Sequence, residues 1–365
     1  MIPVVVHVTA DTGLFGGKDR VLLWLLTKLK ERGLAEPVAV CFRKGLVARM
    51  YRDHGLAVGV LPMSFPFDVR AVFHLASLLR THGAHVVHTH DHKSHVLGRF
   101  AGLLTGVKVV STLHGLMSDA KEMAPPKRAL YGAIVRSTDG LTDWWIAVSR
   151  SLQGRLQRSR HVTYIPNGVD AALATAGEDA SLPCEAGPVV LCMGRLSREK
   201  GQDILLEALA LAIHEVPDTV VWLAGEGPTA PQLERQSDRL GIRDRVRFLG
   251  FKEHIAPLLR RASILALPSR GEGLPIAALE AMSMGVPVVG VAVGGVPDLV
   301  SSREVGLLVP PENPVALADA LQVLLKDPSR ARRLGAAGRA HVTANFSSDR
   351  MADATAEVYR SVLEL

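Results

Sequence analysis

The chain has 365 residues, 48% of them hydrophobic and 21% charged, and its formal net charge is +6. This length exceeds a single ordinary hydrophobic core, so we expect two α/β domains with a cleft between them. The three cysteines are odd in number and form no CxxC pair. They exclude a disulfide framework and a zinc knuckle, and they favour a reducing compartment.

Basic residues are concentrated in the first half of the sequence. Residues 1–167 carry 22 lysines and arginines against 11 acidic residues, whereas residues 168–365 carry 20 against 25. This excess favours contact of the first half with an anionic surface or substrate, such as phospholipid or a lipid diphosphate, although solvated surface charge explains it equally well. No nucleic-acid partner is expected, because the few aromatic residues are not interleaved with the basic ones.

Neither a targeting segment nor a membrane span is expected. Residues 1–8 lack the basic leader and the long apolar core of a secretory signal, and they resemble a buried strand. The longest weakly charged stretch, residues 276–300, contains Glu280, prolines and several glycines, which do not suit a helix in lipid. We therefore expect a cytoplasmic protein.

The pattern of the first half predicts βα units on a parallel sheet. Short valine-rich runs alternate with longer amphipathic segments, such as the helix expected over residues 18–31. Strands are expected over residues 4–8, 37–41, 85–89, 107–112 and 145–148. Residues 1–170 are expected to form an N-terminal Rossmann-like domain, and the Ala/Gly/Glu-rich residues 171–187 a linker.

The second half repeats this alternation more regularly. Strands are expected over residues 189–193, 219–223, 246–249, 264–267, 286–289 and 305–309. The fold class is therefore α/β, with two doubly wound domains, the second over residues 188–345. Residues 346–365 are helical in pattern, and we expect them to return to the first domain.

Loops that follow the strands are where a ligand should bind, because open parallel sheets bind ligands at the carboxyl ends of their strands. After the first strand, Gly16 and Gly17 would let backbone N–H groups approach a phosphate at a helix start; a simple turn is the alternative. This loop lacks the GxGxxG spacing, which argues against a NAD-dependent dehydrogenase.

The loop at residues 194–201 carries two cations, Arg195 and Lys200, after a buried strand. Together they would neutralise a departing diphosphate, on which negative charge grows in the transition state of an enzyme that uses no metal. A solvated loop is the alternative.

A third loop and the helix after it carry two carboxylates eight residues apart, Glu272 and Glu280. Carboxylates accept hydrogen bonds from paired hydroxyls, so Glu280 suits a ribose diol and Glu272 a sugar ring. Because Glu280 is flanked by apolar residues, burying it requires a ligand or a basic partner; a structural salt bridge is the alternative.

These motifs resemble the retaining glycosyltransferase family 4, whose members have the GT-B fold of two Rossmann-like domains. The resemblance covers most of the chain and is most specific in the helix from Glu272 to Glu280 with the strand after it. The other matching segments are Gly16-Gly17, His114-Gly115, Ala147-Val148-Ser149, Ile165-Pro166-Asn167-Gly168-Val169-Asp170, Gly194-Arg195, Lys200-Gly201, Gly225-Glu226-Gly227, Gly285-Val286-Pro287-Val288-Val289, Gly294-Gly295-Val296-Pro297 and Gly306-Leu307-Leu308-Val309.

The resemblance implies an acceptor-binding N-terminal domain and a nucleotide-sugar-binding C-terminal domain. It implies that the catalytic residues are Arg195 and Lys200 on the diphosphate, Glu272 on the donor sugar and His114 near that sugar. It also places Glu280 on the ribose, Gly273 and Leu274 in the donor-binding loop, and Gly16 and Gly17 against the phosphates.

The resemblance further implies retention of configuration, with a donor phosphate oxygen taking the acceptor proton, so that no protein nucleophile, cofactor or metal is required. A UDP-sugar is the favoured donor, with GDP-mannose next. The favoured acceptor is a lipid-linked glycan of surface polysaccharide or glycolipid biosynthesis. A nucleotide-sugar epimerase, a phosphorylase and an inactive binding protein on the same scaffold are the alternatives, although intact Arg195, Lys200, Glu272 and Glu280 argue against the last.

Two other clusters invite a functional interpretation. His88, His90, Asp91, His92 and His95 have the wrong spacing for a closed four-ligand metal site, and a loop near the cleft is expected instead. Trp144, Trp145 and the segment 125–136 mix bulky apolar with basic residues. They suggest peripheral binding to an anionic membrane at its inner, cytoplasmic face; an ordinary packing helix is the alternative.

Overall fold

The computed structural model describes residues 2–10, 15–63, 68–115, 125–157, 159–170, 173 and 182–365, and within these it leaves out the side chains of 125–128, 130 and 131. The chain divides into two compact units. Unit 1 comprises Met1–Gly168 and Ser348–Leu365, and unit 2 comprises Val169–Ser347. The sequence places these divisions at 170 and 345, and most of the expected linker, 171–187, lies outside the described residues.

Unit 1 is built on a seven-stranded parallel sheet with strand order β3-β2-β1-β4-β5-β6-β7. This is the doubly wound order: strands are added on one side of β1 up to β3 and then on its other side from β4 onwards. Two short edge strands, β3 and β7, are absent from the sequence prediction. The strands are β1 (Val4–Thr9), β2 (Glu36–Cys41), β3 (Ala57–Val60), β4 (Val86–Thr89), β5 (Lys108–Leu113), β6 (Trp144–Ala147) and β7 (Val162–Tyr164).

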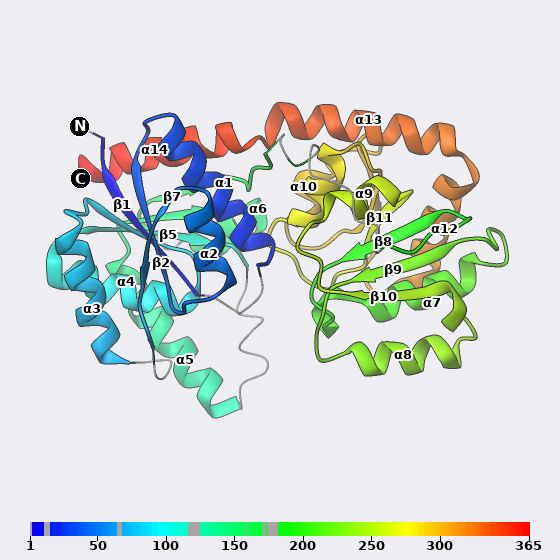
Figure 1. Ribbon diagram of the computed structural model, residues 1–365, viewed down its shortest axis with the longest axis horizontal. Coiled ribbons are helices and arrows are strands. Elements are labelled where there is room, and N and C mark those ends of the chain that lie inside the picture. The colour runs from blue at the N-terminus through cyan, green and yellow to red at the C-terminus, as the bar shows by residue number, and fades with distance from the viewer. Residues whose placement is uncertain are drawn as a thin grey trace. The chain divides into compact units, whose positions relative to one another are not determined.

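Helices cover both faces of this sheet (Figure 1). The C-terminal helix α14 packs against α1, and α4 packs against both α3 and α5. These helices are α1 (Gly17–Glu31), α2 (Leu46–Asp53), α3 (Val69–Thr81), α4 (His92–Thr105), α5 (Pro125–Ser137), α6 (Arg150–Gln153) and α14 (Ser348–Leu363).

Unit 2 repeats the plan with a six-stranded parallel sheet, in the order β10-β9-β8-β11-β12-β13. All six strands overlap the ranges expected from the sequence. They are β8 (Val189–Met193), β9 (Val220–Ala224), β10 (Val246–Gly250), β11 (Ile264–Leu267), β12 (Val288–Val291) and β13 (Leu307–Val309).

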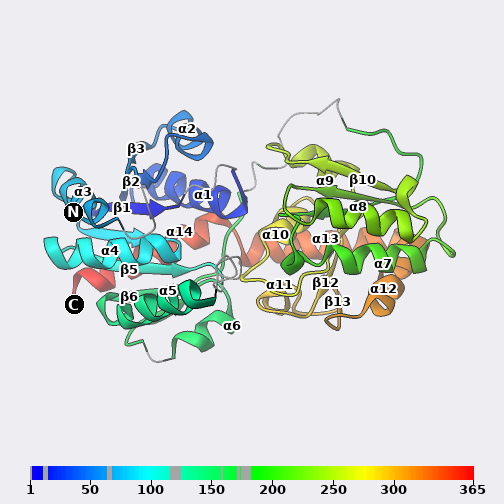
Figure 2. The same cartoon turned by 90° about the horizontal axis from the view of Figure 1, so that it is seen from below.

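The helices of unit 2 also lie on both faces of its sheet (Figure 2). Helix α7 packs against α8 and α12, whereas α10 packs against α13. The helices are α7 (Gln202–Ala212), α8 (Ala230–Arg239), α9 (Ala256–Arg261), α10 (Ile276–Ser283), α11 (Val296–Leu299), α12 (Pro314–Lys326) and α13 (Pro328–Asn345).

Strand β1 shows how the sheet positions polar residues. Because both faces are covered, residues 5–9 are all buried, and the run carries no simple alternation of apolar and polar residues. Val6 and Val8 join the apolar cluster of β2, α3 and α4. Side chains alternate between faces, so His7 points to the other face, and it pairs in register with His88 of β4.

The side chain of Arg99 joins α4 to the region around α5 and β6. Its guanidinium is fully buried and donates to Thr142 Oγ1 at 2.9 Å, to the Val135 carbonyl at 2.8 Å and to Asp139 Oδ1 at 2.7 Å. It also lies 5.2 Å from the ring centre of Trp145.

The suggestion that Trp145 meets a membrane is therefore wrong. Trp145 is 3% exposed beneath Arg99. The Trp144 indole donates to Thr163 Oγ1 at 3.0 Å and stacks on His161, and this ring is half-buried. In the part of the chain that is described, every helix is too short or too polar to cross a bilayer.

Candidate active site

Cationic side chains of unit 2 lie in the loop after β8. Arg195 is exposed, and its carbonyl accepts a hydrogen bond from the Gln202 side chain at 3.0 Å. Lys200 ends a single 3₁₀ turn, Arg198–Lys200, and is followed by Gly201 with φ +66°. A Cβ at Gly201 would lie 2.0 Å from the Pro268 carbonyl oxygen, so only glycine lets this loop approach the end of β11 so closely.

Lys200 and Glu272, both candidate site residues from the sequence, form a charge pair. Lys200 Nζ donates to Glu272 Oε1 at 2.8 Å, with 31% of the lysine side chain exposed and 8% of the carboxylate side chain. Burial alone would lower the pKa of Lys200, but the Glu272 carboxylate outweighs it and raises that pKa above its usual value. Lys200 therefore remains a cation at neutral pH.

The Glu272 loop is held on two further sides. Ser269 donates its hydroxyl to Glu272 Oε1 at 2.7 Å. Gly294 has φ +54°, and a Cβ there would lie 1.8 Å from the Glu272 carbonyl oxygen. Next along the loop, Gly273 is half-buried and Leu274 is 3% exposed. The loop after β12 therefore packs directly on the backbone that carries Glu272.

Arg270, which the sequence prediction missed, joins three loops of unit 2. Its guanidinium donates to both oxygens of Asp203 at 2.8 Å, to the Arg198 carbonyl at 2.8 Å and to Glu312 at 2.5 and 3.0 Å. Glu312 has φ +53°, a strained conformation for a residue with a Cβ. These bonds raise the pKa of Arg270 above its usual value and fix the start of the Glu272 loop beside the Lys200 loop.

Glu280 lies on α10, eight residues after Glu272, and is fully buried. Its backbone carbonyl accepts a hydrogen bond from Ser283 Oγ at 2.8 Å. The expectation that this carboxylate is buried on an apolar helix is correct, and such burial requires hydrogen-bonding partners.

The glycine loop of unit 1 leads into α1. Gly16 is the N-cap residue and Gly17 the first helical residue, whereas residues 11–14 of the loop lie outside the described part. Gly16 has φ −86°, and a Cβ there would meet only Asp19 Oδ2, at 3.6 Å. The described residues therefore leave room for a side chain at Gly16, whose N–H donates to Asp19 Oδ2 at 3.0 Å.

Lys18 and Asp91 add charge beside this loop. Lys18 Nζ donates to Thr9 Oγ1 at 2.8 Å and to the Ala10 carbonyl at 3.0 Å, and lies 3.8 Å from Asp91 Oδ2. Asp91 caps α4 and accepts a hydrogen bond from the Ala10 N–H at 2.6 Å. A cation and a helix start therefore lie at the end of β1, as phosphate binding requires.

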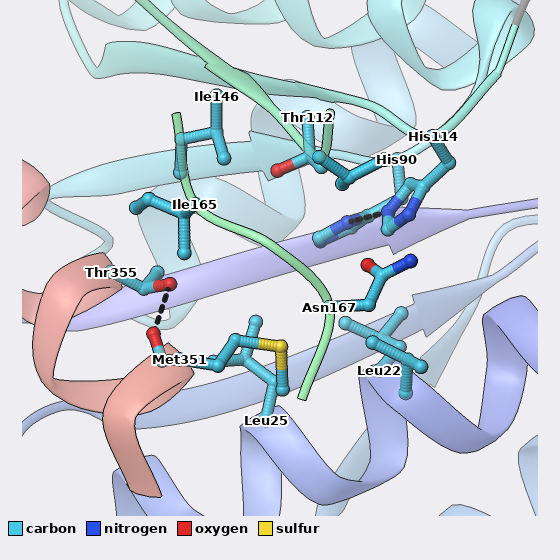
Figure 3. A pocket seen from close by; sticks show the side chains of 12 residues that line it. Leu22, Leu25, His90, Thr112, His114, Ile146, Ile165, Asn167, Met351 and Thr355 are labelled. Carbon is cyan, nitrogen blue, oxygen red and sulfur yellow. Dashed lines mark hydrogen bonds between the residues drawn. The ribbon is translucent and has the colours of Figure 1, made fainter. Parts of the chain in front are cut away.

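His114 follows β5 and contacts His90, with 3.2 Å between His114 Nε2 and His90 Nδ1. Figure 3 shows the pair beside a small cavity whose other walls include Asn167, Leu22 and Thr112. Burial and the nearby Lys18 lower the pKa of His114 to about 3, so the ring is neutral. Its Nδ1 is buried and has no hydrogen-bond partner among the described residues.

The histidines that cluster in the structure are not the set grouped from the sequence. His88 and His90 share a face, as expected, and their ring centres lie 4.2 Å apart. Their third neighbour is His7 from β1 rather than His92 or His95. His95 lies on α4 and bonds Thr89 Oγ1 at 2.8 Å. Asp91 caps that helix.

The predicted residues thus fall into two sets. Lys200 and Glu272 touch each other in unit 2, where Arg195 and Glu280 also lie. Gly16, Gly17 and His114 belong to unit 1. Lys18, Arg270 and His7 were missed, and of these only Lys18, the residue directly after Gly17, could have been found from local sequence.

Comparison with known proteins identifies the family. Residues 15–173 match the model for Glycosyltransferase Family 4, and residues 178–341 match that for Glycosyl transferases group 1. The D-inositol 3-phosphate glycosyltransferase of Streptomyces scabiei is 30% identical over 90% of this chain and 80% of that protein. The chain belongs to glycosyltransferase family 4. It is accordingly a glycosyltransferase enzyme.

Other known proteins are similar to this chain over different lengths. The alpha-D-kanosaminyltransferase of Streptomyces kanamyceticus is 32% identical over 63% of this chain and 60% of that protein. The crystal structure of HepE from Anabaena, in complex with UDP-glucose, matches with a TM-score of 0.84 and 22% identity. That match covers 98% of this chain and 99% of HepE, which confirms the GT-B fold.

The buried histidines of this glycosyltransferase predict a loss of stability in acid. Burial lowers the pKa of His7 and His114 to about 3, and the pKa values of His88, His90 and His95 well below the usual value. The unfolded chain then binds more protons below its histidine pKa of about 6.5. The free energy of unfolding should fall as the pH decreases from about 6.5, by about 1.4 kcal/mol per pH unit for each such histidine.

Urea unfolding between pH 7.5 and pH 5 measures this slope. His95→Asn should lower the stability at pH 7.5 but make the slope shallower, because one buried histidine is removed. A free energy of unfolding that stays constant down to pH 5 would contradict the assignment of neutral buried rings.

Proposed function

We propose that the protein transfers a hexose-type sugar, with retention of configuration, from a nucleotide-diphosphate sugar to an acceptor hydroxyl. A UDP-sugar is the favoured donor and GDP-mannose the next. The observation that carries the proposal is the Lys200–Glu272 pair in unit 2. The two residues lie at the ends of adjacent strands, and Lys200 Nζ is 2.8 Å from Glu272 Oε1. The UDP-glucose complex of the structurally similar HepE supports the choice of donor.

Each donor group has a counterpart in unit 2. Lys200 and Arg195 would bind the diphosphate, because both cations lie in one loop and Lys200 stays charged at neutral pH. Glu272 would accept hydrogen bonds from sugar hydroxyls and Glu280 from the ribose diol. Gly273 and Leu274 would line the donor site between Glu272 and Glu280.

The transfer itself needs no protein nucleophile in this proposal. The acceptor oxygen bonds to the anomeric carbon as the bond from that carbon to the phosphate oxygen breaks, and a phosphate oxygen takes the acceptor proton. The products are a nucleoside diphosphate and a glycoside. Lys200 and Arg195 stabilise the growing phosphate charge, so we propose that no metal is required.

Unit 1 carries groups of its own that suit a phosphate and a sugar oxygen. We assign a phosphate to the start of α1 at Gly16 and Gly17, where the Gly16 N–H donates to Asp19 Oδ2 and Lys18 lies beside the loop. The Nδ1 of His114, which has no hydrogen-bond partner in the part of the chain that is described, suits an oxygen of the donor sugar. We assign the acceptor to the same unit, and we favour a lipid-linked glycan of surface polysaccharide or glycolipid biosynthesis.

Calorimetric titration with UDP, GDP, ADP and their sugar conjugates tests the donor. UDP should bind with micromolar affinity, equally with and without magnesium. Glu280→Gln should weaken that binding at least tenfold, because the ribose would lose an anionic acceptor. Glu234→Gln, an exposed glutamate of α8, is the matched control. Binding that requires magnesium, or that survives in Glu280→Gln, would contradict this assignment.

Steady-state transfer kinetics test the two cations. Lys200→Met and Arg195→Met should each lower kcat/KM about 100-fold or more, since they remove charge stabilisation of the leaving diphosphate. Arg198→Met changes an exposed arginine of the same loop and should have little effect. Near-normal turnover in both Met variants would defeat the mechanism. Release of the free nucleoside diphosphate only when acceptor is present would distinguish transfer from epimerase or phosphorylase activity.

We also propose that unit 1 rests on an anionic membrane. Exposed apolar residues gather on the neighbouring helices α3 and α4: Val69, Phe73, Phe100, Leu103 and Leu104. The same helices expose Arg70, Arg80 and Lys93. An apolar surface with basic residues around it suits the boundary between lipid headgroups and acyl chains.

Co-sedimentation with vesicles of phosphatidylglycerol and phosphatidylcholine tests this surface. Binding should weaken as salt rises, and the double variant Phe73→Asp, Leu103→Asp should reduce it severalfold. Val315→Asp, Val323→Asp places the same charges on exposed valines of α12 and is the control. If the protein does not bind at low salt, the membrane proposal is wrong.

A further inference from the structure

Six polar side chains form a continuous hydrogen-bonded chain through the interior of unit 1. They come from three strands or strand ends and from the C-terminal helix α14, and each is at least partly buried. In order, they are Thr112, His88, Tyr359, His7, His90 and His114.

The first half of this hydrogen-bond chain runs from β5 to β1 through α14. Thr112 Oγ1 lies 2.7 Å from His88 Nε2, and His88 Nδ1 lies 2.6 Å from the Tyr359 hydroxyl. That hydroxyl lies 3.4 Å from His7 Nε2. Tyr359 is thus the only bridge between His88 and His7 in this chain of described contacts.

The second half leads to the candidate active site. His7 Nδ1 lies 3.1 Å from His90 Nε2, and His90 Nδ1 lies 3.2 Å from His114 Nε2, the contact drawn as a dashed line in Figure 3. His114 Nδ1 is the free end, with no partner among the described residues.

The three inner histidines could also be considered as a metal site, since His7, His88 and His90 place ligand atoms within 4.8 Å of one another. However, each of their six ring nitrogens already has a hydrogen-bond partner in the chain. A metal would have to replace several of these bonds. We therefore interpret the cluster as a hydrogen-bond chain.

All four imidazoles are neutral, because burial lowers the pKa of each below its usual range. A neutral imidazole has one N–H donor and one acceptor nitrogen. The chain can then be satisfied in only two ways, with every hydrogen directed towards His114 or every hydrogen directed towards Thr112. The first arrangement leaves a proton on His114 Nδ1, and the second leaves that nitrogen bare.

Thr112 decides between the two arrangements. If its hydroxyl donates to His88 Nε2, the hydrogen is satisfied, and the one N–H left over is that of His114, which a ligand can accept. If Thr112 accepts instead, its own hydrogen is buried without an acceptor among the described residues. In the ligand-free protein each arrangement thus leaves one buried donor without a partner among the described residues, but the second also leaves the buried Nδ1 of His114 without one. Because each unsatisfied buried polar group is costly, the first arrangement is favoured.

We infer that Thr112 and Tyr359 are positioning residues that fix the His114 tautomer with its proton on Nδ1, so that this ring presents an N–H donor to an oxygen of the bound sugar. The sugar contact rests on the proposed function, whereas the tautomer is a property of the free protein. Tyr359 acts from α14, 245 positions along the chain from His114. Neutral imidazole tautomers interconvert readily in water, and the chain removes that freedom.

Long-range ¹⁵N–¹H correlation spectra of the ligand-free protein, labelled at histidine, test the tautomer directly. The wild type should show His114 with a protonated Nδ1 and a bare Nε2, with His114→Gln used to assign the signals. Thr112→Val and Tyr359→Phe should each convert this signal to a mixture of tautomers. Thr112→Ser should restore the wild-type signal, because it keeps the hydroxyl.

Tyr51→Phe removes another buried tyrosine hydroxyl of unit 1, one that contacts the Asp19 carbonyl and not the chain, and it should leave the His114 signals unchanged. A wild-type His114 with a bare Nδ1 would overturn the inference, as would a Thr112→Val variant that keeps the wild-type tautomer. Binding of zinc to the wild type with joint shifts of His7, His88 and His90 would overturn it in favour of a metal site.

Kinetics then separate this inference from the proposed function. Thr112→Val should lower kcat roughly tenfold with little change in KM, and Thr112→Ser should recover it. A tautomer shift in Thr112→Val with unchanged kcat would overturn the role in catalysis while leaving the tautomer assignment in place. If His114→Gln also binds and transfers the donor normally, the proposed contact of His114 with the sugar is the part that fails.

Discussion

The burial of both sheets on each of their faces is the constraint on which the rest of the structure depends. Residues 5–9 of β1, for example, are buried without interruption. A polar side chain on a strand must therefore find its partners inside the protein, and groups that meet a ligand must lie in the loops after the strands. Lys200, Glu272 and His114 occupy such loops, whereas His7 and His88 lie on the strands themselves.

Charge in unit 2 follows from the same constraint. The Glu272 carboxylate is almost fully covered, and Lys200 and Ser269 compensate its charge inside the protein. Arg270 also pairs with Asp203 and Glu312 in close bidentate geometry, although those two carboxylate side chains are 40% and 58% exposed. A donor diphosphate would thus meet loops whose positions are fixed beforehand, and such preorganisation is what makes fixed charges effective in the transition state.

Much of the fold, and the proximity of the candidate site residues Lys200 and Glu272 in unit 2, could be predicted from the sequence, because the signals are local. The six strands of unit 2 are valine-rich runs, and Lys200 and Glu272 stand in short motifs. Strands β3 and β7 were missed because both lie at sheet edges, only partly buried, and β3 contains Gly59. Arg270 was missed because its partners are 42 and 67 residues away.

The histidine chain lies beyond sequence reasoning for a related reason. The spacing of His88 and His90 shows that they share a face, but their partners come from β1 and from α14, 271 residues after His88. Six buried polar groups cost free energy that leucines would not, and hydrogen bonding at best restores it. Such a network is therefore hard to explain by stability alone. The network adds a fixed direction, because the hydrogens of an unbranched hydrogen-bond chain must all point one way, and the end of this chain at His114 lies at the candidate active site.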